Sequence, residues 1–258
     1  MQPRQTPKWL SLFITAFGAK GLVVLAWWLG ALHAERIRNL QHSYPFLEVT
    51  GSAGSGKSST LLSVLWQLIG TDQCSHLSPA HTSNRGLLRK FNAVVDLPVV
   101  LEEIESEGTP FDWDALKPCF NGDAVGYQPG TATKFRGALV ILGNPPLSEA
   151  LCSRFVIVEL DHSQRTEASA QALQDLFDMH RAGGFDFYDT AKAAGERLEG
   201  LLLHTTAYFV QPHNNKRAAF NHAQLHALLG VLDDLFVLPT EAREDAHIEI
   251  AAMCLITD

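Results

Sequence analysis

The stretch that decides the fold of this 258-residue chain is Gly51-Ser52-Ala53-Gly54-Ser55-Gly56-Lys57-Ser58. Its spacing is GxxxxGK[ST], in which glycines let the backbone curl around a phosphate and direct its N–H groups inward. A helix that follows would aim the positive end of its dipole at the same phosphate. We expect Lys57 to reach the β- and γ-phosphates of a nucleotide and the Ser58 hydroxyl to bind Mg²⁺, with Ser59 beside them.

The residues around this loop have the pattern that the motif requires. Residues 45–50 read as a strand, and residues 58–68 have helical spacing, with leucines at positions 61, 62, 65 and 68 on one side. A Gly-Ser loop with an unrelated lysine would need neither flank. The stretch therefore predicts a P-loop that binds ATP and Mg²⁺.

Further apolar runs predict the rest of a sheet. Strands are expected at 98–103, 138–143 and 155–160, with a weaker one near 74–78, and helices at 84–95 and 112–121. Continuous leucine and β-branched runs are typical of strands buried on both faces, and alternation with helices favours a parallel sheet. The predicted fold class is α/β, a P-loop NTPase (AAA+-like) sheet sandwiched by helices, with flanking helical segments.

The chain divides into three expected parts: an N-terminal helical segment at 1–42, the P-loop core at 43–161 and a helical region at 162–258. The net charge is −8, and the residues from Asp161 onward hold fifteen carboxylates against seven Lys or Arg. The first 160 residues are therefore neutral, which leaves room for a local basic ridge but not for a wide nucleic-acid footprint.

The N-terminal segment is strongly apolar, but Lys20 interrupts it. The uninterrupted run from Gly21 to Leu32 is twelve residues long, short of the roughly 20 that span a bilayer. A signal peptide is the alternative, with Arg4 and Lys8 at its basic end. Because ATP is cytosolic, we expect a cytoplasmic protein with no membrane span, in which this segment is a buried helix.

Two acidic residues end the predicted strand at 98–103. Glu102 is expected to hold Mg²⁺, and Glu103 to polarise an attacking water, because strand ends at the carboxyl edge of such a sheet line its ligand site. The alternative is a solvated acidic loop, since Glu105 and Glu107 continue the run.

Two polar residues flank the last predicted strands. Asn144 follows the strand at 138–143 and would orient water or sense the γ-phosphate; an Asn that closes a turn before proline is the alternative. Arg154 precedes the strand at 155–160 and would supply a cation to the transition state from a neighbouring subunit. A surface arginine paired with a carboxylate is the alternative there.

Histidines and cysteines give no comparable signal. His222 and His226 are four residues apart but have no acidic third ligand beside them, so we expect ordinary histidines on a helix surface. The four cysteines are far apart, with no CxxC pair, and are expected to be reduced thiols.

Two further segments carry a family resemblance: LKPCFNGD at 116–123 and KFRGALVILGNPP at 134–146. With the loop and the acidic pair, residues 44–161 resemble the superfamily 3 helicases of the AAA+ class, most closely the phage, plasmid and poxvirus primase–helicase type. The resemblance implies a central P-loop strand, and a hairpin that projects into the channel of a hexameric homo-oligomer to grip single-stranded DNA.

By this resemblance Lys134 and Arg136 are the DNA-binding candidates, with Lys117 behind them, and an ordinary charged surface hairpin is the alternative. The family's nucleotide lysine and magnesium hydroxyl are matched by Lys57 and Ser58, and its acidic pair by Glu102 and Glu103. Its sensor is matched by Asn144 and its arginine finger by Arg154. The Glu-Glu pair departs from the commoner Asp-Glu. These residues hold no primase domain, so no primase activity is implied for them, and a possible primase or replication partner domain would lie outside them.

The expected function is therefore an ATP-dependent DNA helicase or translocase in phage, plasmid or mobile-element replication. An AAA+ ATPase that remodels or senses proteins without DNA contact is one alternative, favoured slightly by the acidic C-terminal region. A P-loop phosphotransferase is another, disfavoured because no lid with clustered arginines follows Glu103.

Overall fold

The computed structural model describes residues 5–52, 54–71, 76–79, 82–102, 111–125, 134–143, 148–161, 166–209 and 215–256. Its centre is a five-stranded parallel sheet with the order β2-β3-β4-β1-β5. The strands are β1 (Phe46–Thr50), β2 (His76–Leu77), β3 (Val95–Glu102), β4 (Arg136–Leu142) and β5 (Phe155–Glu159). Every predicted strand is present, including the weak one that became β2.

The order of the strands corrects one expectation. β1, which leads into the glycine-rich loop, lies between β4 and β5, so β4 and not β1 is the middle strand of the described sheet. The register places Val49 beside Leu142 and Thr50 beside Glu159. The carboxyl ends of β1, β3, β4 and β5 therefore meet at one edge of the sheet.

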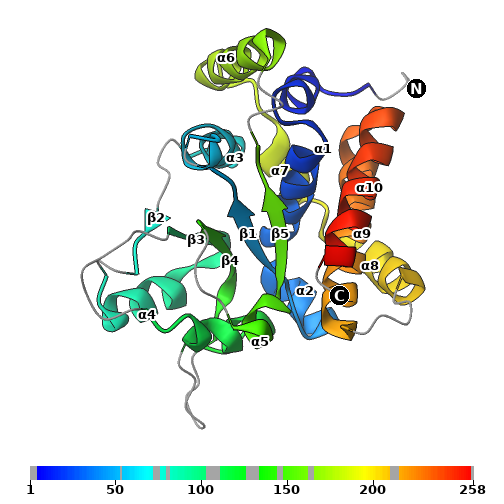
Figure 1. Cartoon of the computed structure of the whole chain (residues 1–258). Coiled ribbons are helices and arrows are strands. Elements are labelled where there is room, and N and C mark those ends of the chain that lie inside the picture. The colour runs from blue at the N-terminus through cyan, green and yellow to red at the C-terminus, as the bar shows by residue number, and fades with distance from the viewer. Residues whose placement is uncertain are drawn as a thin grey trace.

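Helices surround the sheet, as Figure 1 shows. They are α1 (Lys8–Ala31), α2 (Ala34–Gln41), the π-helix η1 (Lys57–Leu62), α3 (Ser63–Leu68), α4 (Asn84–Ala93), the 3-10 helix η2 (Trp113–Asn121), α5 (Glu149–Cys152), α6 (Glu167–Arg181), α7 (Phe187–Lys192), α8 (Gly195–Phe209), α9 (Lys216–Phe236) and α10 (Thr240–Ile256). The helix expected at 112–121 is a 3-10 helix; Pro118 inside it has no N–H to continue an α-helical ladder.

Alternate residues of each strand face two separate hydrophobic clusters. On one face, Leu47, Val140 and Val156 pack with α1, α3 and α9. On the other, Leu139 and Phe155 pack with α4, η2 and α5. Period-two alternation of buried residues on both faces explains why the strands read as continuous apolar runs. The sheet is sandwiched by helices, as predicted.

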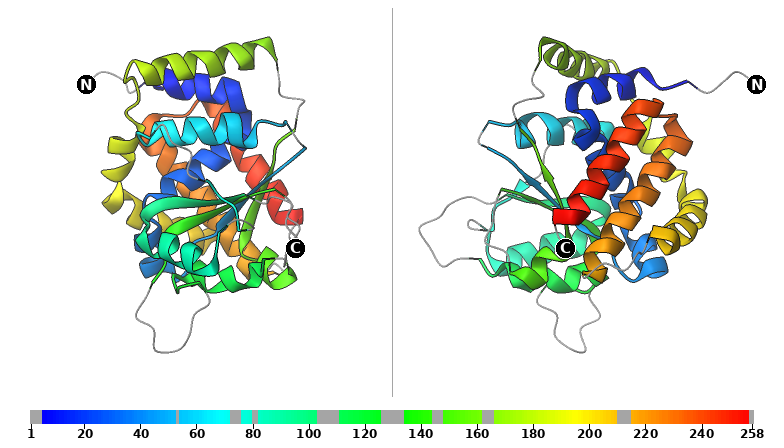
Figure 2. Two further views of the ribbon diagram at one scale, coloured as in Figure 1. Left: turned by 90° about the vertical axis from the view of Figure 1, so that its left-hand side faces the viewer. Right: turned by 45° about the vertical axis from the view of Figure 1, so that its right-hand side comes forward.

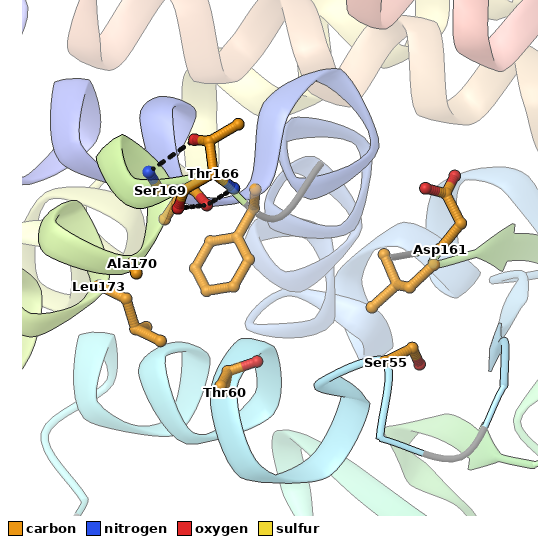
Figure 3. A pocket seen from close by; sticks show the side chains of 10 residues that line it. Ser55, Thr60, Asp161, Thr166, Ser169, Ala170 and Leu173 are labelled. Carbon is orange, nitrogen blue, oxygen red and sulfur yellow. Dashed lines mark hydrogen bonds between the residues drawn. The ribbon is translucent and has the colours of Figure 1, made fainter. Parts of the chain in front are cut away.

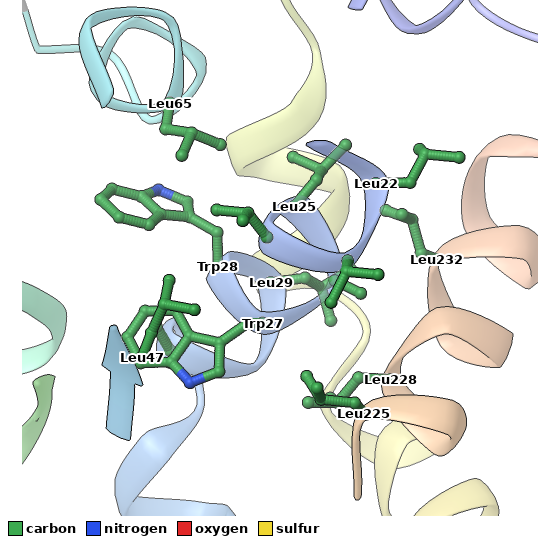
Figure 4. Close-up of a cluster of buried hydrophobic side chains, with 14 of the residues drawn as sticks. Leu22, Leu25, Trp27, Trp28, Leu29, Leu47, Leu65, Leu225, Leu228 and Leu232 are labelled. Carbon is green, nitrogen blue, oxygen red and sulfur yellow. The ribbon is translucent and has the colours of Figure 1, made fainter. Parts of the chain in front are cut away.

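The apolar N-terminal segment is a core helix. Trp27 and Trp28 are fully buried, and Figure 4 shows them on the side of α1 that faces Leu47 of β1 and Leu65 of α3, while the leucines of α9 lie on the other side of α1. By length and composition α1 is long and apolar enough to cross a membrane, yet it lies inside the domain as the core helix of a soluble protein does. Truncating either Trp to Ala would cost about 3–5 kcal/mol.

α1 is kinked at Gly18, whose φ of 60° and ψ of −156° lie outside the helical region and favour glycine. The kink turns the first part of the helix toward α6, which lies alongside it in both views of Figure 2. α6 begins with a capping box in which Thr166 and Ser169 exchange hydrogen bonds between side chain and backbone. The kinked part of α1 and the start of α6 lie beside the loop that follows β1, and residues of all three line one cavity.

Candidate functional site

The glycine-rich loop has the backbone conformation that its sequence predicts. Gly51, Gly54 and Gly56 have φ angles of 131°, 77° and 91°, which favour glycine. A Cβ atom on Gly51 would lie 2.1 Å from the carbonyl oxygen of Leu160. Only glycine fits this approach of the loop to the end of β5. Ala53 lies outside the described residues.

Lys57 begins the helix after the loop and folds over the loop's own backbone. Its Nζ atom donates to the carbonyl oxygens of Gly51 at 2.5 Å and Ser52 at 3.1 Å, and lies 3.4 Å from Ser55 Oγ. The first helical turn is a π-turn, in which the N–H of Leu61 donates to the carbonyl of Gly56. The ammonium group is thus held at the mouth of the loop, where a phosphate chain would replace the carbonyl oxygens as its partners.

The structure brings Ser58 and Glu102 together across two elements. Ser58 Oγ donates to Glu102 Oε1 at 3.2 Å, although the residues are 44 positions apart. Glu102 ends β3, and β4 separates this strand from β1. A hydroxyl and a carboxylate side by side are a ligand set that suits Mg²⁺. Glu103 and Asn144, the other two residues expected at this edge, lie outside the described residues.

Arg154 lies at the amino ends of the strands, opposite the carboxyl ends where the glycine-rich loop lies. It immediately precedes β5, and the carbonyl of Arg154 accepts from the N–H of Phe46 at the start of β1. The five residues of β5 separate it from the loop's edge by roughly 16 Å at about 3.3 Å per residue. Arg154 therefore does not belong to the site formed by Lys57 and Ser58 of its own chain.

The surroundings of Arg154 keep its guanidinium near the surface. Nη1 donates to the carbonyl of Ala150, and Cζ lies 5.7 Å from the Phe120 ring centroid. Desolvation, followed by the nearby charge of Arg217, lowers the pKa of Arg154. Arg217 donates to Ser153 Oγ at 2.8 Å, so α9 places a second cation next to the first.

Lys134 and Arg136 come just before and at the start of β4. Lys134 is exposed, and its backbone forms an isolated antiparallel β-bridge with that of Asp123. The N–H of Phe135 donates to the carbonyl of Gly122 at 2.8 Å. These contacts join the two ends of the segment that was expected to be a hairpin; residues 126–133 lie outside the described residues. Lys117 is bound to Asp114 by an ion pair of 2.7 Å.

A cavity of about 330 Å³ lies beside the glycine-rich loop. Figure 3 shows Ser55 and Thr60 on its loop side, Asp161 at its rim and Ser169, Ala170 and Leu173 of α6 across from them. Phe17, the residue before the α1 kink, also lines it, and Lys20 forms an ion pair of 3.4 Å with Asp161. Outside the loop, the sequence analysis singled out none of the residues that line this cavity. The local signal that could have indicated the cavity is Gly18, a helix-breaking residue within an apolar helix.

The histidines of α9 differ from their prediction. His222 is buried, with Nδ1 2.7 Å from the carbonyl of Ala218, and His226 is half-buried against His247. Both are held by packing between α9 and its neighbours, so the expectation of surface histidines was wrong. Within the described residues, no three His, Cys, Asp or Glu side chains are grouped to hold a metal ion.

No protein-family model matches this sequence, and no curated protein matches it either. Among solved structures, the chain is similar to the active helicase Cch of SCCmec type IV, with a TM-score of 0.68, 13% identity, and coverage of 95% of this chain and 50% of that one. The chain thus spans about half the length of that protein.

Two further similarities are weaker. A putative ATPase from Cytophaga hutchinsonii has a TM-score of 0.48 at 12% identity, covering 93% of this chain and 83% of that one. The JCV helicase has a TM-score of 0.36 at 13% identity, covering 91% and 65%. Together with the strand order and the glycine-rich loop, the similarity to Cch shows an α/β P-loop NTPase fold.

Proposed function

We propose that this chain is an ATP-hydrolysing motor of the superfamily 3 helicase type that acts on single-stranded DNA. The observation that supports it most strongly is the contact of Ser58 with Glu102 next to Lys57. A phosphate-binding loop alone indicates only that a phosphate chain is bound. A hydroxyl and a carboxylate joined beside it supply the ligands of the Mg²⁺ that accompanies ATP.

In this proposal Lys57 and the loop, from Gly51 through Ala53 to Ser59, hold the triphosphate, and Ser58 and Glu102 hold Mg²⁺. Glu103 comes directly after β3 in the sequence, and Asn144 comes two residues after the end of β4. In the proposal these two residues aim and polarise the attacking water. The cavity between α1 and α6 has the size to take a nucleoside. Phe17 would pack against the base, and Asp161 would accept a hydrogen bond from a sugar hydroxyl.

The position of Arg154 supports a shared site between subunits. An arginine about 16 Å from its own loop, at the far end of β5, could reach a phosphate only on a neighbouring copy. We propose that copies assemble as a homo-oligomeric, hexameric ring in which Arg154 meets the γ-phosphate of the next subunit. The transition-state charge calls for such a cation.

The proposal for DNA rests on the segment that joins η2 to β4. Lys134 is exposed beside the Asp123 bridge, and Arg136 begins β4. Lysine and arginine contacts to phosphates give affinity without sequence preference. The activity of Cch as a helicase is a property of that protein and is consistent with this assignment at the level of fold.

A protein-remodelling ATPase is the second candidate function. The observation that favours it is the acidic balance of the residues from Asp161 onward, with fifteen carboxylates and seven Lys or Arg. Such a surface repels nucleic acid. The ATPase rate with and without single-stranded DNA separates the two: stimulation by DNA supports the motor, and an unchanged rate over a range of low salt concentrations contradicts it.

A further inference from the structure

Arg38 of α2 is buried against Phe120 and against Gly137, which is close to Lys134 and Arg136 in the sequence. Arg38 is only 6% exposed, and α2 lies at the amino ends of the strands (Figure 1). Nε donates to the carbonyl of Phe120 at 3.2 Å, and Nη1 donates to the carbonyl of Gly137 at 2.7 Å. One guanidinium thus connects Phe120, at the end of η2, to Gly137, at the start of β4.

The rings around Arg38 fix its plane. Its Cζ atom lies 5.2 Å from the Phe135 ring centroid and 5.9 Å from that of Tyr44. Gly122 packs on its stem: a Cβ atom there would lie 3.1 Å from Arg38 Cδ, and the φ of Gly122 is 91°. Arg38 therefore contacts residues on both sides of the bridge between Asp123 and Lys134.

A buried arginine at this point is costly. Desolvation lowers the pKa of Arg38 to about 10, and among the described residues no carboxylate forms an ion pair with it. An apolar side chain would fill such a site at a smaller cost in desolvation. A guanidinium, however, has donors in a planar fork that can hold two carbonyl groups in a fixed relation, which a lysine ammonium on a flexible stem cannot do.

α2 also connects this contact to the helices at the other end of the chain. Arg36 forms an ion pair of 2.8 Å with Glu199 of α8, and Gln41 Nε2 donates to the carbonyl of Leu202 at 3.1 Å. The base of the segment is therefore fixed to the helical layer through one short helix.

We propose that Arg38 is a positioning residue for DNA binding, which holds the start of β4, and with it Lys134 and Arg136, against Phe120 and Gly122 without touching DNA itself. The inference rests on the proposed DNA motor function. Lys134 and Arg136 keep a fixed direction toward DNA phosphates only when the start of β4 is held in place. Loss of the guanidinium fork then weakens DNA binding from a buried position.

The test uses the whole chain with Arg38→Lys, which keeps the charge and removes the fork. Affinity for a fluorescent oligo-dT is measured against salt, together with ATPase rates and melting temperature. We expect the fold-loss of DNA affinity to be at least about ten times the fold-loss of the basal ATPase rate. We also expect the slope of log K against log salt to flatten by about 0.7 for each DNA phosphate that the variant no longer neutralises.

Two further variants keep the test decisive. Gly122→Ala places a methyl group against Arg38 Cδ and displaces the arginine side chain. This variant should reproduce the loss of DNA affinity even if Arg38→Lys folds poorly. Leu232→Ala lowers stability in the core between α1 and α9, away from Arg38, and is the control for destabilisation alone. In a Lys134→Ala/Arg136→Ala background, Arg38→Lys should cause no further loss of affinity, because all three changes act on the same phosphate interactions.

Three results would overturn the inference. Arg38→Lys and Gly122→Ala could both bind DNA like the wild type. Arg38→Lys could lose affinity and basal ATPase in the proportion that Leu232→Ala shows at an equal drop in melting temperature. The losses could also add fully to those of the Lys134 and Arg136 changes. A wild-type chain that hydrolyses ATP and binds no DNA contradicts the proposed motor function instead, which distinguishes the two failures.

Discussion

Ser58 and Glu102 are 44 residues apart in the sequence, yet Ser58 Oγ donates a hydrogen bond to Glu102 Oε1 at 3.2 Å. One residue belongs to the helix after the glycine-rich loop and the other ends β3. Two oxygen ligands from separate elements meet because the parallel strands all end at this edge of the sheet. This contact turns a phosphate-binding loop into a candidate site for a metal–nucleotide complex.

The first prediction concerns Mg²⁺. Ser58→Ala and Glu102→Gln should each raise the Mg²⁺ concentration for half-maximal ATPase by about 10-fold or more, a usual cost of weakening a metal site. The double variant should cost less than the product of the two, because both changes act on one ion. A Mg²⁺ titration of the ATPase rate measures this. Glu149→Gln, exposed on α5, is the control, and unchanged titration curves for Ser58→Ala and Glu102→Gln would rule out the metal role.

The second prediction concerns Arg154. Because Arg154 lies at the amino end of β5, Arg154→Ala should lose turnover while it keeps ATP affinity. Mixing Arg154→Ala with Lys57→Ala should recover part of the activity, since one intact interface forms in a mixed ring. The measurement is the ATPase rate of mixtures over a range of ratios. Rates that never exceed those of the separate variants would argue against a shared site.

The third prediction concerns the cavity beside the loop. Ala170 of α6 lines it, so Ala170→Trp should fill the space and weaken ATP binding by at least about 10-fold, equivalent to roughly 1.4 kcal/mol. Binding of inorganic tripolyphosphate, which has no nucleoside, should stay within about twofold. Ala168→Trp, exposed on the same helix and outside the cavity lining, is the matched control. Equal loss of ATP and tripolyphosphate binding would show that the cavity does not hold the nucleoside.

The sequence predicted the sheet well because the middle of the longer strands is buried on both faces. Runs such as 138–142 are apolar throughout, and β4 confirmed that interpretation. Helix–helix packing was harder to predict: His222 has polar neighbours in the sequence, but α9 turns it inward, and nothing local to residue 222 indicates which side of the helix is covered. Arg38 was missed for the same reason, since its two carbonyl partners are 82 and 99 residues away.

The site was predicted in part. The glycine pattern specifies backbone angles, so the loop at residues 51–58 can be recognised from local sequence alone. The position of Glu102 follows from its place at the carboxyl end of a strand in a parallel sheet, and the alternation of strands and helices indicates such a sheet. The cavity depends on the kink at Gly18 and on the approach of α6 to α1, and those are tertiary features with only a faint local signal.

The fourth prediction concerns pH. The Nδ1 atoms of His226 and His247 lie 2.7 Å apart. Burial, and secondly the neighbouring His247, lowers the pKa of His226 to about 4, and burial lowers that of His247. The unfolded chain, with histidine pKa values near 6.5, binds more protons between these values. Stability should therefore fall as pH drops from about 6.5 toward 4.

Thermal unfolding between pH 7.5 and 4.5 measures this, and each 1 kcal/mol lost should lower the melting temperature by about 2–4 °C. His226→Gln keeps a hydrogen-bonding group and cannot gain a proton, so its melting temperature should decline less steeply with acid. A variant with the same decline as the wild type would show that other groups govern the acid sensitivity.

The central claim is that this chain couples ATP hydrolysis to single-stranded DNA. The most direct measurement is the Mg²⁺-dependent ATPase rate of the whole chain with and without oligo-dT, with Lys57→Ala as the blank. We predict turnover that Lys57→Ala abolishes and that DNA increases several-fold, together with a larger mass in solution when ATP is bound. A wild-type rate no higher than that of Lys57→Ala would contradict the account.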